Sequence, residues 1–83
     1  MSNQQNQPVF RMPRLGNVQA AVFERSNNNG TWFSTSITES YKDGQGNWQS
    51  TSSFSTGELG NVAKAAEVCR DWIIKQELKR QAQ

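Results

Sequence analysis

Histidine is absent from this chain of 83 residues, and cysteine occurs only once, at Cys69. Without histidine the usual general base is missing, and a single cysteine leaves no pair of ligands for zinc. The seven carboxylates are scattered, because Asp43 belongs to an expected turn, Glu58 to a helix start, and Glu67 to an exposed helix face. The sequence therefore predicts no enzyme, no metal site, no cofactor and no small-molecule substrate.

Long hydrophobic runs are also missing. No stretch approaches the roughly 20 apolar residues of a membrane span, and residues 1–7 lack the apolar segment of a signal peptide. A single cysteine suits a reducing compartment. We therefore expect a cytoplasmic protein without a membrane partner.

Excess charge of either sign is small. Nine Lys and Arg residues stand against seven Asp and Glu residues, for a formal net charge of +2. This balance permits nucleic-acid binding without requiring it. The length allows one domain with a modest core, which a partner subunit would help to stabilise, so we expect a homodimer.

The amino-terminal segment is polar. Residues 1–13 contain both prolines among several glutamines and asparagines, which predicts a flexible arm, followed by a single domain over 14–77. Arg11 and Arg14 add positive charge that either contacts a polyanion or belongs to a solvated tail. A fourth strand near residues 9–12 stays open, because proline restricts a strand to the edge of a sheet.

A period of two residues appears after the arm and indicates β-strands. The turn signals are Asn-Asn-Asn-Gly at residues 27–30 and Asp-Gly-Gln-Gly at residues 43–46. The predicted strands cover residues 15–25, 31–41 and 48–54.

The second turn sets the predicted register. If Gly44 and Gln45 form a two-residue loop, Tyr41 lies opposite Trp48 and Thr35 lies opposite Phe54. One face of the sheet is then apolar and is expected to meet a helix, with Val18, Ala20, Val22, Phe33, Ile37, Tyr41, Trp48 and Phe54. The other face is rich in hydroxyls and carries Gln19, Phe23, Arg25, Trp32, Ser34, Ser36, Thr38, Ser40, Gln49, Thr51 and Ser53.

A long helix is predicted after the strands. Ser55 can cap the amide of Glu58 at its start, and the helix is expected to fray over residues 78–83. Cys69 lies on its apolar stripe, where a free cysteine usually acts as a small hydrophobe. The stripe is wide enough to leave apolar area for a second subunit, and we predict a dimer interface of Val62, Ala65, Cys69 and Trp72. The predicted fold class is α+β, βββα or ββββα.

The polar face of the sheet is the candidate binding surface. Exposed aromatic side chains can stack on unpaired bases, and cations and hydroxyls can contact phosphates. Residues 15–54, however, contain two basic and three acidic side chains, a net charge of −1. The alternative is a plain solvated face on which Trp32 covers a sheet edge. On the binding hypothesis, Trp32 and Phe23 stack on bases, and the phosphate contacts come from Arg11, Arg14, Arg25 and Lys42.

Two segments carry a resemblance to a known group. These are Gly-Asn-Val-Gln-Ala-Ala-Val-Phe at residues 16–23 and Ser-Tyr-Lys-Asp-Gly-Gln-Gly-Asn-Trp at residues 40–48. From Gly16 to about Gln76 the chain resembles the single-stranded nucleic-acid-binding positive cofactor four, Whirly and Pur-alpha domains. It is also similar to short uncharacterised bacterial proteins with a Ser-Tyr-Lys-Asp-Gly hairpin.

The first resemblance implies a homodimer joined through its helices that grips single-stranded DNA or RNA with strands and hairpin tips. The matching positions here are Arg25, Trp32, Lys42 and Trp48. The chain departs from this group in having three strong strand signals rather than four, and a nearly neutral sheet. The second hypothesis is a non-enzymatic protein–protein interaction or assembly module that uses the wide helix stripe.

Overall fold

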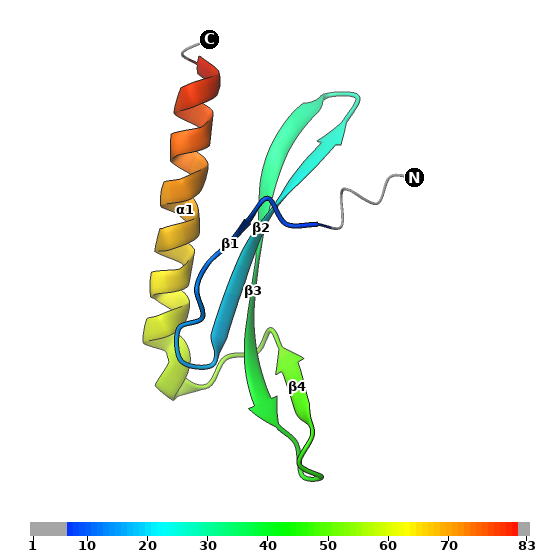
Figure 1. Cartoon of the computed structure of the whole chain (residues 1–83), viewed down its shortest axis with the longest axis vertical. Coiled ribbons are helices and arrows are strands. Elements are labelled where there is room, and N and C mark those ends of the chain that lie inside the picture. Colours follow the sequence, from blue (N-terminus) through cyan, green and yellow to red (C-terminus); the bar gives the residue numbers. More distant parts are fainter. Residues whose placement is uncertain (1–6, 82–83) are drawn as a thin grey trace.

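A computed structural model describes residues 7–81 of the chain, and shows one antiparallel sheet followed by one long helix (Figure 1). The strands lie in the order β1-β2-β3-β4, which confirms the α+β class in its ββββα form. The elements are β1 (Phe10–Arg11), β2 (Val18–Asn27), β3 (Gly30–Lys42), β4 (Trp48–Thr51), the 3₁₀ turn η2 (Thr56–Glu58) and α1 (Leu59–Gln81).

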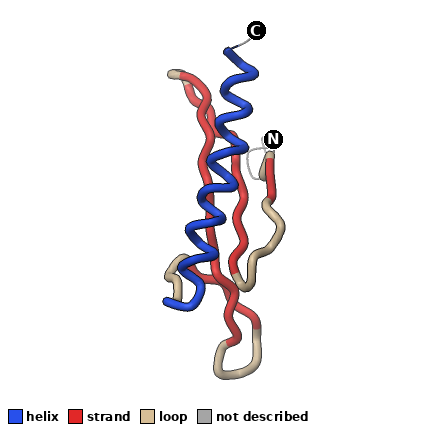
Figure 2. The backbone as a smooth tube through the Cα atoms, turned by 90° about the vertical axis from the view of Figure 1, so that its left-hand side faces the viewer, coloured by secondary structure: helices blue, strands red, loops and turns tan. Residues whose placement is uncertain are grey.

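The long β2–β3 hairpin forms the centre of the sheet, and α1 runs along one of its faces (Figure 2). Because successive side chains of a strand point to opposite faces, the hairpin has an inner face toward α1 and an outer face away from it. The inner face comprises Val18, Ala20, Val22 and Glu24 of β2 with Phe33, Thr35, Ile37 and Glu39 of β3. The outer face comprises Gln19, Ala21, Phe23 and Arg25 of β2 with Trp32, Ser34, Ser36, Thr38, Ser40 and Lys42 of β3.

The short strand β1 corrects the prediction of a flexible arm for residues 7–13; residues 1–6 lie outside the described residues. The Val9 amide donates to the Val22 carbonyl (2.8 Å), and the Met12 amide donates to the Ala20 carbonyl (3.1 Å). The prolines do not prevent this pairing, because β1 is an edge strand with one bonded side.

Two apolar side chains explain why β1 joins the sheet. Phe10 and Met12 are two residues apart and point to the same face, where Met12 is buried and Phe10 packs against the core. The buried core is small and comprises Met12, Val18, Ala20, Val22, Ala65 and Cys69.

The hairpin between β3 and β4 has a three-residue loop, so the predicted two-residue loop is wrong. The Asp43 amide donates to the Asn47 carbonyl (2.9 Å), and the Gly46 amide donates to the Asp43 carbonyl (3.0 Å). Gly46 adopts a φ of 85°, a left-handed conformation that suits the last position of such a loop. The extra loop residue shifts the register by one.

The register shift reverses the faces of β4. Trp48 pairs with Lys42 and Gln49 pairs with Tyr41, so Trp48 lies on the outer face rather than against α1. The strand also ends at Thr51, and Phe54 therefore does not pair with β3.

The helix packs against the sheet through the side chains that were predicted to form the dimer interface. Ala65 and Cys69 are 0% and 1% exposed, and Trp72 contacts the rings of Phe10 and Phe33. Val62 also packs against this core. The predicted dimer interface is thus wrong, because its side chains are occupied by the chain's own sheet.

Both ends of the helix are held by side chains of the sheet. The Ser55 amide and hydroxyl donate to the two carboxylate oxygens of Glu39 (2.9 Å each), so Ser55 does not form the predicted side-chain cap. At the other end, Arg80 donates to Glu24 (3.0 Å) and lies over the ring of Phe33. The helix extends to Gln81, and residues 82 and 83 of the segment predicted to fray lie outside the described residues.

Candidate nucleic-acid interface

The outer face is the open side of the sheet. The helix lies over the inner face of the β2–β3 hairpin, and within residues 7–81 no helix or strand lies over the outer face (Figure 1). The outer face is therefore accessible to a ligand along the whole hairpin in this part of the chain.

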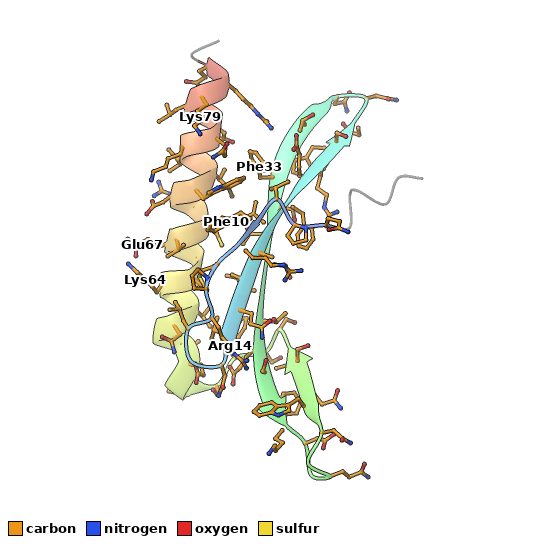
Figure 3. The ribbon with its side chains drawn as sticks, in the orientation of Figure 1. Phe10, Arg14, Phe33, Lys64, Glu67 and Lys79 are labelled. Atoms are coloured by element: carbon orange, nitrogen blue, oxygen red, sulfur yellow. The ribbon has the colours of Figure 1, made fainter. Side chains whose placement is uncertain are left out.

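One aromatic side chain and two cations gather where β4 joins the sheet. Trp48 is 61% exposed, and the Lys42 ammonium lies 5.4 Å from the centroid of its ring. Arg14, Gln19 and Ser40 line a hollow of about 370 Å³ with Trp48. Figure 3 shows Arg14 beside the lower part of the hairpin. Trp48, Lys42 and Arg14, here called the lower cluster, place a flat ring and two cations together at the β3–β4 end of the sheet.

Amide and hydroxyl groups border the lower cluster. The Gln19 side-chain amide lies 3.5 Å from the Ser40 hydroxyl, and both line a second hollow of about 270 Å³ beside Trp48. These groups can donate and accept hydrogen bonds, which is the chemistry needed for base edges. Gln19 and Ser40 were not among the predicted site residues, although the period of two already assigned them to the polar face.

A second group, here called the upper cluster, lies on the same face near the turn between β2 and β3 and comprises Phe23, Arg25 and Trp32. The Arg25 guanidinium stacks over the ring of Phe23, 5.0 Å from its centroid. Trp32 pairs with Arg25 across the strands and is 47% exposed. A cation and two aromatic rings therefore lie together here as well.

The two clusters are joined by a row of small polar side chains. Lys42 lies ten positions after Trp32 in β3, which corresponds to roughly 33 Å of extended strand. Arg11 flanks this row, because it pairs with Ala21 at the other edge of β2. The row itself comprises Ser34, Ser36, Thr38 and Ser40.

The acidic residues of the sheet point away from this surface. Glu24 lies on the inner face and accepts from Arg80, and Glu39 lies on the inner face and accepts from Ser55. Residues 15–54 have a net charge of −1, but the two glutamates lie on the inner face while Arg25 and Lys42 lie on the outer face. The period of two could have shown this, since both glutamates share the parity of the apolar positions.

Asp43, the third acid of this region, is engaged by its own hairpin. Its carboxylate accepts from the backbone amides of Asn47 and Gln45 (2.9 Å each) and from the side chain of Gln49 (3.2 Å). The Asn47 amide, then the Gln45 amide, lowers the pKa of this carboxyl from its usual value. The carboxylate organises the loop that supports Lys42 and Trp48.

All seven predicted binding residues thus lie on or beside the outer face. The structure brings Arg14, Lys42 and Trp48 together in the lower cluster. It brings Phe23, Arg25 and Trp32 together in the upper cluster, and leaves Arg11 between the two.

Other kinds of site receive no support from the described residues. Residues 7–81 contain no group of three or more Cys, Asp or Glu side chains arranged to hold a metal ion. No helix in this range is both long enough and apolar enough to cross a membrane.

The chain was compared with protein-family models, curated proteins and solved structures. None of them matches it. Its function therefore has to be inferred from the surface itself.

Proposed function

We propose that the outer face binds single-stranded DNA or RNA as a non-catalytic module. The observation that carries this proposal is the division of charge between the two faces of the sheet. Arg11, Arg25 and Lys42 lie on the outer face, while Glu24 and Glu39 lie on the inner face. Cations beside exposed rings match the needs of a polyanion with flat bases.

A single strand fits this surface better than a duplex does. Trp48 and Trp32 are exposed as flat rings, and bases can stack on such rings only when they are not paired. The hydroxyl row between the clusters supplies hydrogen bonds without strong base preference. The single free thiol of Cys69 suits a reducing compartment, and we propose the cytoplasm as the site of this activity.

The direct test is fluorescence anisotropy with a labelled single-stranded oligonucleotide, at low salt and then at about 0.2 M. We expect binding at low salt that weakens as salt rises, because phosphate contacts release counterions. Non-specific affinities are typically 10⁻⁴ to 10⁻⁶ M at physiological salt, so the absence of binding tighter than about 100 μM at low salt would end the proposal.

The stacking role is tested by Trp48→Ala and Trp32→Ala. Each substitution should weaken binding by roughly tenfold, since one stacked base contributes about 1–3 kcal/mol. Tyr41→Ala is the matched control, because Tyr41 is an exposed aromatic residue on the opposite face of the same strand. Equal losses in all three variants would argue against the outer face.

The cationic role is tested by Lys42→Gln. This change should reduce the slope of log affinity against log salt by about 0.7 if Lys42 contacts one phosphate of a single strand. Lys64→Gln removes the same charge from α1, where Lys64 pairs with Glu67, and should leave the slope unchanged. If the chain shows no binding to nucleic acid but binds another protein, this result would favour the alternative hypothesis of a protein–protein interaction or assembly module.

A further inference from the structure

Most of the edge of β3 that faces away from β2, at residues 30–38, has no neighbouring strand among the described residues. β4 pairs only with Glu39–Lys42, so within residues 7–81 no strand pairs with this edge at residues 30–38. The Ser40 amide donates to the Asn17 carbonyl, which shows that Ser40 directs its backbone groups toward β2. Because this direction alternates along an antiparallel strand, the amides and carbonyls of Thr31, Phe33, Thr35 and Ile37 point to the unpaired edge.

An apolar hollow lies directly beside this edge. It has a volume of about 430 Å³ and is lined by Thr35 and Ile37 of β3 and by Ile73 and Ile74 of α1. Unpaired backbone groups beside an apolar hollow form a surface onto which another chain can add a strand. Within residues 7–81 the core has six buried apolar side chains, which is few, so additional burial would stabilise the fold.

We propose that a second copy of this chain occupies this edge in a two-fold symmetric dimer. The β3 strands run antiparallel, with Thr35 opposite the second copy's Thr35 and Phe33 opposite the second copy's Ile37. This register pairs an aromatic with a β-branched side chain on both sides of the axis. The two four-stranded sheets become one continuous sheet, and the same patch is used by both copies.

The position of α1 fits this arrangement. Adjacent strands lie about 4.8 Å apart, and α1 packs over β2 and β3 together (Figure 2). The hollow on the β3 side of α1 leaves room for a second helix on the joined inner face. Packed helices typically lie about 8–10 Å apart, so the two helices can meet across these hollows.

The charges beside the hollow identify a second copy as the occupant. Arg70 and Glu77 also line it, at three to four residues on either side of Ile73 and Ile74. When two such helices meet antiparallel at these isoleucines, Arg70 of each copy faces Glu77 of the other. The surface is therefore complementary to itself in charge as well as in backbone hydrogen bonding.

The dimer does not depend on the proposed nucleic-acid binding. It leaves the outer face free, because both helices lie on the inner side of the joined sheet. Its interface differs from the Val62, Ala65, Cys69 and Trp72 stripe, which faces the chain's own sheet.

Sedimentation equilibrium on the full chain tests the proposal. The wild-type protein should dimerise with a Kd tighter than about 1 mM. Arg70→Glu and Glu77→Arg should each weaken dimerisation by roughly tenfold, because each change places like charges opposite one another twice. The double variant exchanges the two charges and should restore wild-type dimerisation. Arg70 and Glu77 are two helix turns apart, so this rescue requires contact between copies.

Two further variants complete the design. Lys64→Glu makes the same kind of charge change on the side of α1 that faces away from the sheet, where Figure 3 shows Lys64 and Glu67, and should not alter dimerisation. Thr35→Pro removes an amide that points to the free edge and should abolish the dimer while circular dichroism remains that of the folded chain. A monomer at millimolar concentration, or a dimer whose Kd is unchanged by Arg70→Glu and by Glu77→Arg, would overturn the proposal.

Discussion

Trp72 of α1 stacks on Phe10 of β1, with ring centroids 5.2 Å apart and ring planes inclined by 14°. The same indole meets the edge of Phe33 at 5.5 Å. One helix residue therefore connects the edge strand to the central hairpin. This contact explains how a strand of only two residues is retained at the edge of the sheet.

Removal of the Phe10 ring should therefore destabilise the whole fold. We expect Phe10→Ala to lower the free energy of unfolding by about 2 kcal/mol, less than for a fully buried phenylalanine because Phe10 is half-buried. Urea unfolding followed by circular dichroism measures this change. Val9→Ala is the matched control in the neighbouring exposed position, and equal effects of the two changes would contradict a structural role for the Phe10–Trp72 stack.

Glu39 should be important for stability although it is an acidic residue. It is only 7% exposed, and its two carboxylate oxygens accept from the amide and the hydroxyl of Ser55. Glu39→Ala leaves both donors without this acceptor and should cost about 2 kcal/mol in unfolding free energy. Glu39→Gln retains one acceptor oxygen and should cost less. An effect no larger than that of Glu67→Ala, which alters an exposed helix position, would refute the prediction.

The hairpin tip provides a matched pair of glycine substitutions. Gly46 has a φ of 85°, and Gly46→Ala should cost about 1 kcal/mol because a side chain is strained in this conformation. Gly44 has no positive φ, and a Cβ there meets no atom within 4 Å. Gly44→Ala should therefore be nearly neutral. Thermal unfolding of both variants measures the difference, and equal stabilities would contradict the three-residue loop.

The hairpin tip should also respond to acid. The backbone amides of Asn47 and Gln45 lower the pKa of Asp43 below its usual value of 3.8. A lowered pKa in the folded state stabilises the fold above the unfolded-state pKa, and this contribution is lost as pH falls through the folded-state pKa.

NMR measures this acid response directly. The amide shifts of Gln45 and Asn47 should follow a titration with a midpoint below 3.8 in the wild-type protein, and this titration should be absent in Asp43→Asn. A midpoint at or above 3.8 would show that these hydrogen bonds do not favour the carboxylate.

Much of the candidate surface could be predicted from local patterns. The alternation of Val18, Ala20 and Val22 with polar residues assigned Gln19, Phe23 and Arg25 to the opposite face, and the structure confirms these positions. The same alternation predicts that Glu24 and Glu39 point to the inner face. The net charge of the segment does not show this, because a count along the chain ignores the face on which each side chain lies.

Other features could not be read in this way. The face of Trp48 depends on one loop residue, since a three-residue loop closed by Asp43 and Asn47 inverts all of β4 relative to a two-residue loop. The orientation of α1 was uncertain because its apolar stripe is wider than the area that a sheet can cover. Only packing shows that Ala65 and Cys69 face inward while Ile74 borders the unpaired edge of β3.

By itself, the sequence determined that β2, β3, β4 and α1 form, because those choices depend on periodicity and turn residues within a few positions of one another. The tertiary structure alone decided the pairing of β1, the register of β4 and the stripe of α1 that is buried. Each of these depends on contacts between residues far apart in the chain, such as Phe10 with Trp72 and Glu39 with Ser55. These contacts contribute to the free energy of folding only after the strands and the helix have packed together.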